Sequence, residues 1–172
     1  KILKRAKQLI QNGEDIFSSS SLKKFLKNNY TVTNFKENDD ILESFSKLDD
    51  HDIYSCLKEW TNNHDFIISS LSKRILNREP LKIKTQNEKF SENKINELKQ
   101  KVSEKYNISI EDTNYLVFTD KVSNNAYQHH KTHINILMKN GEIKDITKAS
   151  DQFDIEALSK TVNKYFLCYP EM

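Results

Sequence analysis

The sequence predicts an α+β fold, with a helical part over residues 1–79 followed by an α+β part over residues 80–172. Three observations lead to this prediction. Apolar side chains recur every three or four residues in the first part, the period of a helix with one buried face. After Pro80 the pattern changes to alternating, β-branched and aromatic runs, which are typical of strands. The pair Asn140-Gly141 separates two of these runs and predicts a β-hairpin.

Five helices are expected in the first part, and residues that begin and end helices stand at their boundaries. Their apolar faces are expected at residues 2–10, 22–26, 41–45, 53–60 and 67–75. Gly13 is a natural end for the first helix, and Asp49 and Asp65 stand where N-cap residues belong. The Asn62-Asn63 pair predicts a turn between two antiparallel helices.

The second part predicts an antiparallel or mixed sheet with two helices. The expected order is strand, helix, three strands, helix and strand, at residues 81–84, 91–102, 114–122, 133–138, 142–147, 154–158 and 164–169. Apart from one added strand and a polar insertion at residues 124–131, this is the order of a ferredoxin-like split βαβ sheet. The boundary between the two parts is expected near residues 78–80.

Composition excludes several classes of protein. The 27 basic and 25 acidic residues leave a net charge of only +2, so the chain has no strong nucleic-acid signal. Two glycines are too few for a phosphate-binding glycine loop or a dinucleotide fingerprint. No apolar run approaches the length of a membrane span. Cys56 and Cys168 stand alone in apolar patterns, which predicts buried free thiols and a reducing cytoplasm. The helical start at Lys1, without a methionine, suggests a fragment of a longer protein.

Two His-Asp dipeptides, His51-Asp52 and His64-Asp65, raise the possibility of a metal site. In HD-type phosphohydrolases such a pair joins another histidine and a distant aspartate to hold a divalent metal that activates water. The two aspartates here also fall in a first helical turn and at an N-cap, where acids stabilise the helix terminus. Capping is the favoured interpretation of both.

Three further histidines, His129, His130 and His133, have the composition of a metal site but fall in an expected polar loop. No cysteine or carboxylate at ligand spacing accompanies them, so a solvated loop is the favoured interpretation. The sequence also lacks a nucleophile elbow. No catalytic residue and no metal ligand is assigned, and the chain alone carries no complete active site.

Basic residues gather at the expected junction between the last helix and the first strand. Arg74 and Arg78 are four residues apart and share one helical face, and Lys82 follows in the strand. Arginine occurs only three times in the chain, and its planar fork suits phosphate. A phosphate site and an ordinary solvated face both remain open, and Arg78 could instead pair with a nearby acid.

Three segments of the sequence resemble one protein family. They are KILKRAKQLIQNGEDIF at residues 1–17, LDDHDIYSCLKEWTNNHDFIISSLSKRILNREPLKI at residues 48–83 and MKNGEIKDITKASDQF at residues 138–153. The family is that of the dGTPase-like HD-domain phosphohydrolases, which includes bacterial dNTP triphosphohydrolases and the human SAM-and-HD-domain enzyme. The resemblance covers most of the chain and matches the region after the catalytic HD core.

The resemblance implies a C-terminal lobe, in which residues 1–79 continue the helices of the HD domain. Such a lobe packs on the HD core of the same chain, takes part in homo-oligomer assembly and in some members helps bind a nucleotide effector. The lobe needs no cofactor of its own; the divalent metal (Mg, Mn, Fe or Zn) would lie in the HD core. A family segment Arg-x-Leu-Phe-Lys corresponds to residues 78–82, which gives Arg78 and Lys82 a phosphate-binding role, and Lys139 matches a further basic position. Glu79 and Pro80 depart from the family's residues.

Two functions are therefore expected. The first is the catalytically silent C-terminal lobe of a metal-dependent phosphohydrolase, acting on deoxynucleoside triphosphates, with a role in assembly or regulation. The alternative is an interaction or assembly module without enzymatic activity, which explains the moderate charge equally well.

Overall fold

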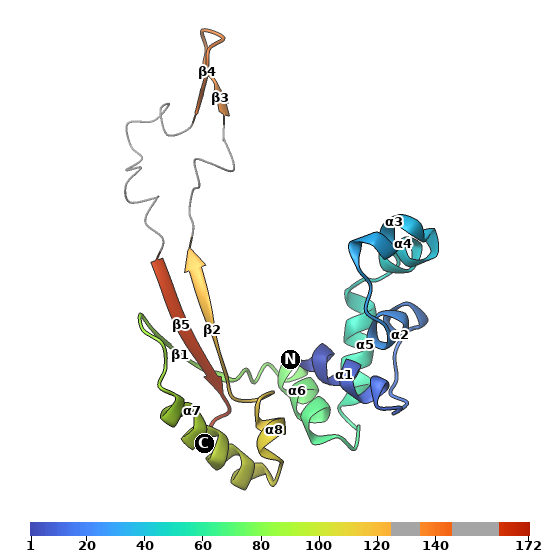
Figure 1. Cartoon of the computed structure of the whole chain (residues 1–172), viewed down its shortest axis with the longest axis vertical. Helices are drawn as coiled ribbons and strands as arrows, with labels where there is room; N and C mark the ends of the chain where they lie inside the picture. The colour runs from blue at the N-terminus through green and yellow to red at the C-terminus, as the bar shows by residue number, and fades with distance from the viewer. Residues whose placement is uncertain (125–134, 146–161) are drawn as a thin grey trace. The chain divides into compact units, whose positions relative to one another are not determined.

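The protein is described by a computed structural model of the 172-residue chain, which describes residues 1–124, 135–145 and 162–172. The described residues contain eight helices and five strands, with an antiparallel three-stranded sheet (Figure 1). The predicted α+β class is confirmed. None of the helices in these ranges is both long enough and apolar enough to cross a lipid bilayer.

The chain divides into two compact units whose segments alternate along the sequence. The first unit contains residues 1–82, 93–118 and 168–172, and the second contains residues 83–92 and 119–167. The sequence boundary at residues 79 and 80 stays a prediction, because these units group segments on both sides of it.

The core of the first unit is built by the four helices α1 (Ile2–Gln11), α2 (Ser20–Lys27), α5 (Asp50–Trp60) and α6 (Phe66–Leu76). Their apolar faces meet as the periodicity predicts, and Ala6, Cys56 and Ile68 are completely buried. Trp60 is 1% exposed, and its indole N–H donates to the Phe17 carbonyl at 2.8 Å. The large indole therefore lies in the apolar core with its one polar group satisfied.

Two short helices, α3 (Val32–Glu37) and α4 (Asp39–Ser46), lie between α2 and α5 in the sequence. The sequence predicts α4 but not α3, because α3 has no buried residue and so no apolar stripe. Its N-terminus is instead held by a capping box in which Thr31 and Asn34 satisfy each other's backbone N–H groups. Aromatic rings from Phe25, Phe35 and Phe45 pack together beside these helices.

Two more helices, α7 (Glu92–Tyr106) and α8 (Ile110–Thr113), also belong to the first unit, apart from Glu92 at the start of α7. An arginine on α1 ties α8 and the start of α6 to the helical core. The Arg5 Nε donates to Asp65 at 3.1 Å, and its Nη1 donates to Asp112 at 2.9 Å. Asp65 in turn caps α6 by accepting the Ile68 N–H at 2.9 Å.

The strand predicted at residues 114–122 is wrong in its first half. Ser109 caps α8, and the N–H groups of Leu116 and Val117 donate to the Thr113 carbonyl in a turn after that helix. Leu116 and Val117 are each 1% exposed, so their burial in the first unit outweighs their strand propensity. The strand, β2 (Phe118–Asn124), begins only afterwards.

The three-stranded sheet consists of β1 (Lys82–Gln86), β2 and β5 (Val162–Tyr169), with β5 in the middle. The predicted hairpin is confirmed as β3 (Asn135–Leu137) and β4 (Ile143–Asp145), which pair antiparallel with Leu137 opposite Ile143. Within the described ranges it forms a separate two-stranded sheet, whereas the ferredoxin-like order expected from the sequence has one continuous sheet. The helix expected at residues 154–158 lies outside the described residues.

Candidate functional site

The candidate site lies where α6 ends and β1 begins, and a Schellman turn determines its backbone. The Glu79 N–H donates to the Arg74 carbonyl at 2.9 Å, and the Arg78 N–H donates to the Ile75 carbonyl at 3.3 Å. This motif requires a left-handed residue after the helix, a position that glycine normally occupies. Arg78 occupies it with φ of 59°. An L-residue pays roughly 1–2 kcal/mol for this conformation, so an exposed arginine is retained here at a cost to the backbone.

The Arg78 side chain forms no ion pair among the residues that the structure describes. The sequence allows it to pair with Glu79, Asp49 or Asp50, and none of these pairs is present there. No acid among the described residues therefore neutralises its guanidinium.

Lys82, at the start of β1, has a partner close to the C-terminus. Its ammonium lies 3.0 Å from a carboxylate oxygen of Glu171, and both side chains are more than half exposed. The Lys82 ammonium lowers the pKa of Glu171 by hydrogen bonding and by charge. An exposed pair of this kind is weak and can open for a competing anion. Lys105 also binds this segment, donating to the Glu171 carbonyl at 2.9 Å.

Arg74 has a different environment from Arg78, although both belong to the same basic cluster in the sequence. It is half-buried, and its Nη2 lies 3.4 Å from the Tyr106 hydroxyl on α7. The Arg74 Nε is buried and has no hydrogen-bond partner among the described residues. Arg74 thus links α6 to α7, and Arg78 is the more accessible of the two arginines.

Lys139 lies in the turn of the β3–β4 hairpin, exposed, in the second compact unit. The turn has a three-residue loop, closed by the Met138 N–H to the Glu142 carbonyl at 2.8 Å and by the Gly141 N–H to the Met138 carbonyl at 2.9 Å. Gly141 has φ of 85°, which a glycine adopts without steric cost. Arg78 and Lys82 belong to the first unit, and Lys139 belongs to the second.

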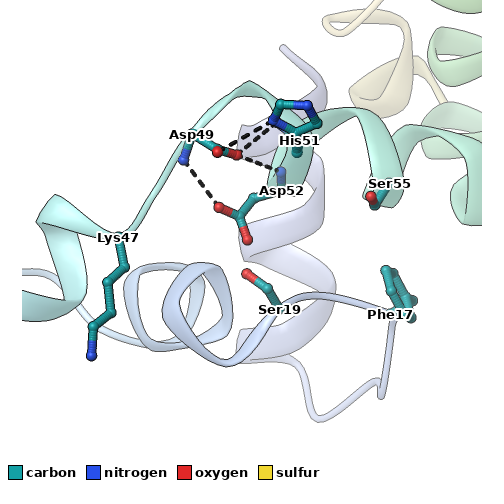
Figure 2. A pocket seen from close by; sticks show the side chains of 7 residues that line it. All are labelled: Phe17, Ser19, Lys47, Asp49, His51, Asp52 and Ser55. Atoms are coloured by element: carbon teal, nitrogen blue, oxygen red, sulfur yellow. Dashed lines mark hydrogen bonds and ion pairs between the residues drawn. The ribbon is translucent and has the colours of Figure 1, made fainter.

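The first His-Asp pair caps a helix beside a pocket of about 410 Å³ (Figure 2). One carboxylate oxygen of Asp49 accepts the N–H groups of His51 at 2.8 Å and Asp52 at 3.3 Å, and Asp52 accepts the Asp49 N–H at 3.0 Å. These two backbone hydrogen bonds lower the pKa of Asp49. The pocket is lined by Phe17, Ser19, Lys47, Asp49, His51, Asp52 and Ser55. The acids that line it are thus engaged at the N-terminus of α5, and the capping interpretation is confirmed.

The second His-Asp pair is a cap as well. Asp65 accepts the Ile68 N–H and is bound by the Arg5 guanidinium, while the exposed His64 lies 3.1 Å from Glu14. Among the described residues, no group of three or more histidine, cysteine, aspartate and glutamate side chains could hold a metal ion. His129, His130 and His133 lie outside the described residues.

Two features of this site are not predicted from the sequence: the pairing of Lys82 with Glu171 and the left-handed backbone of Arg78. No local signal pointed to Glu171, which is 89 residues away in the chain. The only sequence signal for the Schellman turn is Asn77, a polar helix-ending residue, placed shortly before Pro80.

Comparisons with known proteins show similarity to solved structures. A scan against protein-family models finds none that matches, and a search of curated proteins finds no match. A search of solved structures finds the crystal structure of a phosphohydrolase from Bacteroides thetaiotaomicron, with 40% sequence identity and a TM-score of 0.86. The match covers 99% of this chain and 42% of that one, so this chain spans less than half the length of its relative. The chain is thus similar, over almost its whole length, to part of a phosphohydrolase.

Proposed function

We propose that this chain is the C-terminal lobe of a metal-dependent HD-domain phosphohydrolase that acts on deoxynucleoside triphosphates. The observation that carries the proposal is the 40% identity to a phosphohydrolase over 99% of this chain. Because this chain corresponds to only 42% of that protein, the rest of such an enzyme would supply the chemistry. The HD-family resemblance of residues 1–17, 48–83 and 138–153 adds the dGTPase-like subclass.

The lobe itself is proposed to be catalytically silent and to serve assembly and regulation. The described residues do not fit a divalent metal, because the aspartates of both His-Asp pairs are engaged in capping and no metal-binding group is present among them. This chain is therefore proposed to carry out no chemical step itself. Its free thiols, Cys56 and Cys168, fit a reducing cytoplasm.

An activity assay tests the proposal directly. The 172-residue chain and the longer protein encoded with it are incubated with each dNTP and Mn²⁺, and inorganic triphosphate release is measured. Release by the longer protein but not by the chain supports the proposal. Release by the chain alone contradicts the silent lobe, and no release by either favours the interaction module without enzymatic activity.

Within this lobe, Arg78 and Lys82 are proposed to bind the phosphates of a nucleotide effector. Lys139, in the second unit, is proposed separately as a basic residue that binds phosphate. Two observations support the role of Arg78: its guanidinium has no anionic partner among the described residues, and its backbone conformation would suit glycine better. A helix end and a strand start can present two cations to one anion without a glycine loop.

The best test of this site is Arg78→Gly in the longer protein. Glycine adopts the left-handed conformation freely, so the melting temperature should stay unchanged or rise while the affinity for dGTP falls. Glu171→Gln should have the opposite effect. It removes the carboxylate that pairs with Lys82, so the affinity for dGTP should increase. A lower melting temperature with unchanged dGTP affinity in Arg78→Gly would show that the arginine is structural.

A further inference from the structure

The edge of β4 that faces away from β3 carries both an exposed apolar side chain and charged side chains. In the part of the chain that the structure describes, β3 and β4 form a two-stranded sheet in which Asn135, Ile136 and Leu137 oppose Asp145, Lys144 and Ile143. An isolated hairpin of this size is only marginally stable in water. A further strand along one edge would stabilise it.

The register determines which backbone groups of β4 are free to pair. Backbone groups of successive residues in an antiparallel strand point to alternate sides. The Glu142 carbonyl accepts the Met138 N–H at 2.8 Å and so points toward β3. Lys144, two residues on, also points its backbone groups toward β3, whereas the N–H and C=O of Ile143 point outward. Ile143 is therefore the centre of an edge that none of the described strands covers.

On one face Ile143 forms an apolar pair with Leu137, and on the other face two charged side chains flank it. Leu137 and Ile143 lie opposite each other and are 72% and 66% exposed. Glu142 and Lys144 flank Ile143 on the other face, and their charged groups lie 3.3 Å apart. When a second copy of this strand runs antiparallel to the first, the acid of each copy lies opposite the base of the other.

We propose that β4 pairs antiparallel with β4 of a second copy of this chain, with the two-fold axis at Ile143. Each Ile143 N–H then donates to the Ile143 carbonyl of the other copy. Glu142 of each copy lies opposite Lys144 of the other in a non-hydrogen-bonded pair, where side chains approach most closely. The two hairpins become one four-stranded sheet, an isologous interface of the β-augmentation type.

The edge of β3 fits a second copy less well. The same construction on β3 has its axis at Leu137, whose backbone groups point away from β4, and it places Ile136 opposite Met138, a pair without complementary charges. The complementary charges therefore favour β4 over β3 as the strand that pairs with the second copy. The β4 edge would be the surface for the proposed assembly role. Its test measures association only, so the result does not depend on phosphohydrolase activity.

Sedimentation velocity on the 172-residue chain tests the proposal. The wild-type chain of 20.3 kDa should shift from monomer to dimer over about a hundredfold concentration range around the micromolar dissociation constants that small interfaces give. Lys144→Glu places like charges opposite each other twice and should weaken the dimer about tenfold or more. The charge swap Glu142→Lys with Lys144→Glu restores complementarity and should restore the dimer. Lys121→Glu, an exposed change of the same charge on β2, is the control and should leave association unchanged.

Hydrogen exchange separates dimer formation from folding of the hairpin. The Ile143 amide should become protected only as the concentration rises. The Met138 amide, bonded within the hairpin, should show weak protection already at the lowest concentration and stronger protection as the dimer forms. Ile143→Pro removes the outward donor and should abolish association. A wild-type chain that stays monomeric throughout, or a dimer that Lys144→Glu and Ile143→Pro leave intact, would overturn the proposal.

Discussion

Replacing Arg5 by methionine should destabilise the first unit more than replacing any single exposed charged residue on its surface. The Arg5 guanidinium binds Asp65 and Asp112 together, and the side chains of Arg5 and Asp65 are only 13% and 10% exposed. Methionine keeps much of the length and apolar volume of arginine, so the change removes mainly the charge and the hydrogen bonds.

The loss of stability depends on the Asp65 carboxylate, which stays behind without its arginine partner. Asp65 would keep only the Ile68 N–H among these partners, with its charge largely buried. Removing one member of a buried ion pair costs about 3–5 kcal/mol, and partial solvation reduces this value. We expect a loss of about 2–4 kcal/mol in the free energy of unfolding, or roughly 5–15 °C in melting temperature for a chain of this size.

The assay is denaturant unfolding followed by tryptophan fluorescence. Trp60 is the only tryptophan and lies in the same core, so its emission reports on this unit. Asp65→Asn keeps a capping side chain while removing the charge, and the double variant closes a double-mutant cycle. Lys4→Met, on the exposed face of α1, is the control. A loss below about 1 kcal/mol for Arg5→Met, or strictly additive effects in the cycle, would refute the reasoning.

Acidification provides a second measurement of the same interaction. Burial alone would raise the pKa of Asp65, but hydrogen bonds from Arg5 and the Ile68 N–H, with the nearby positive charges, lower it overall. The folded pKa therefore lies below the unfolded value of about 3.9. The stabilisation is complete above the unfolded value and is lost as the pH falls through the folded one. The difference between wild type and Arg5→Met should accordingly shrink below about pH 4.

Three further predictions concern the helical core. Ser19→Ala removes the N-cap of α2 and should cost about 1 kcal/mol by the same fluorescence assay, whereas Ser20→Ala, in the exposed first turn, should cost less than about 0.5 kcal/mol. Ile68→Ala, at a completely buried position, should lower the free energy of unfolding by about 2–5 kcal/mol without changing the m-value. The Cys56 thiol, whose pKa is raised by burial, should react with a disulfide reagent no faster than the chain unfolds, and fast labelling of the native chain would contradict this.

The helices were predictable because the pattern and the capping residues agree. Asp49 and Asp65 mark the starts of α5 and α6, and the apolar period then continues to Trp60. The prediction failed where local propensity and tertiary burial differ. Leu116 and Val117 favour a strand in isolation, yet a turn after α8 buries both in the first unit.

The candidate site could be proposed from its residue types, but the geometry of these residues could not be predicted. Scarce arginines near a helix end pointed to Arg78, and the alternating pattern placed Lys82 on a strand. The pair between Lys82 and Glu171 depends on a contact over 89 residues, which no local pattern contains. A left-handed arginine was also unpredictable, because intrinsic preference favours glycine there.

Glu79 and Pro80, the two departures from the family pattern, have a physical role at this junction. Proline disfavours helical backbone in the residue before it, so Glu79 cannot extend α6. The Glu79 N–H instead closes the Schellman turn on Arg74, and this closure holds Arg78 in its left-handed conformation. The turn therefore presents the guanidinium from a backbone fixed by two hydrogen bonds, before any anion arrives. Such preorganisation reduces the ordering cost of binding, and it would compensate for the nearby acidic charge of Glu79. If Arg78 bound no anion, its left-handed backbone would only destabilise the fold. Loss of dGTP affinity at unchanged stability in Arg78→Gly is therefore the decisive result.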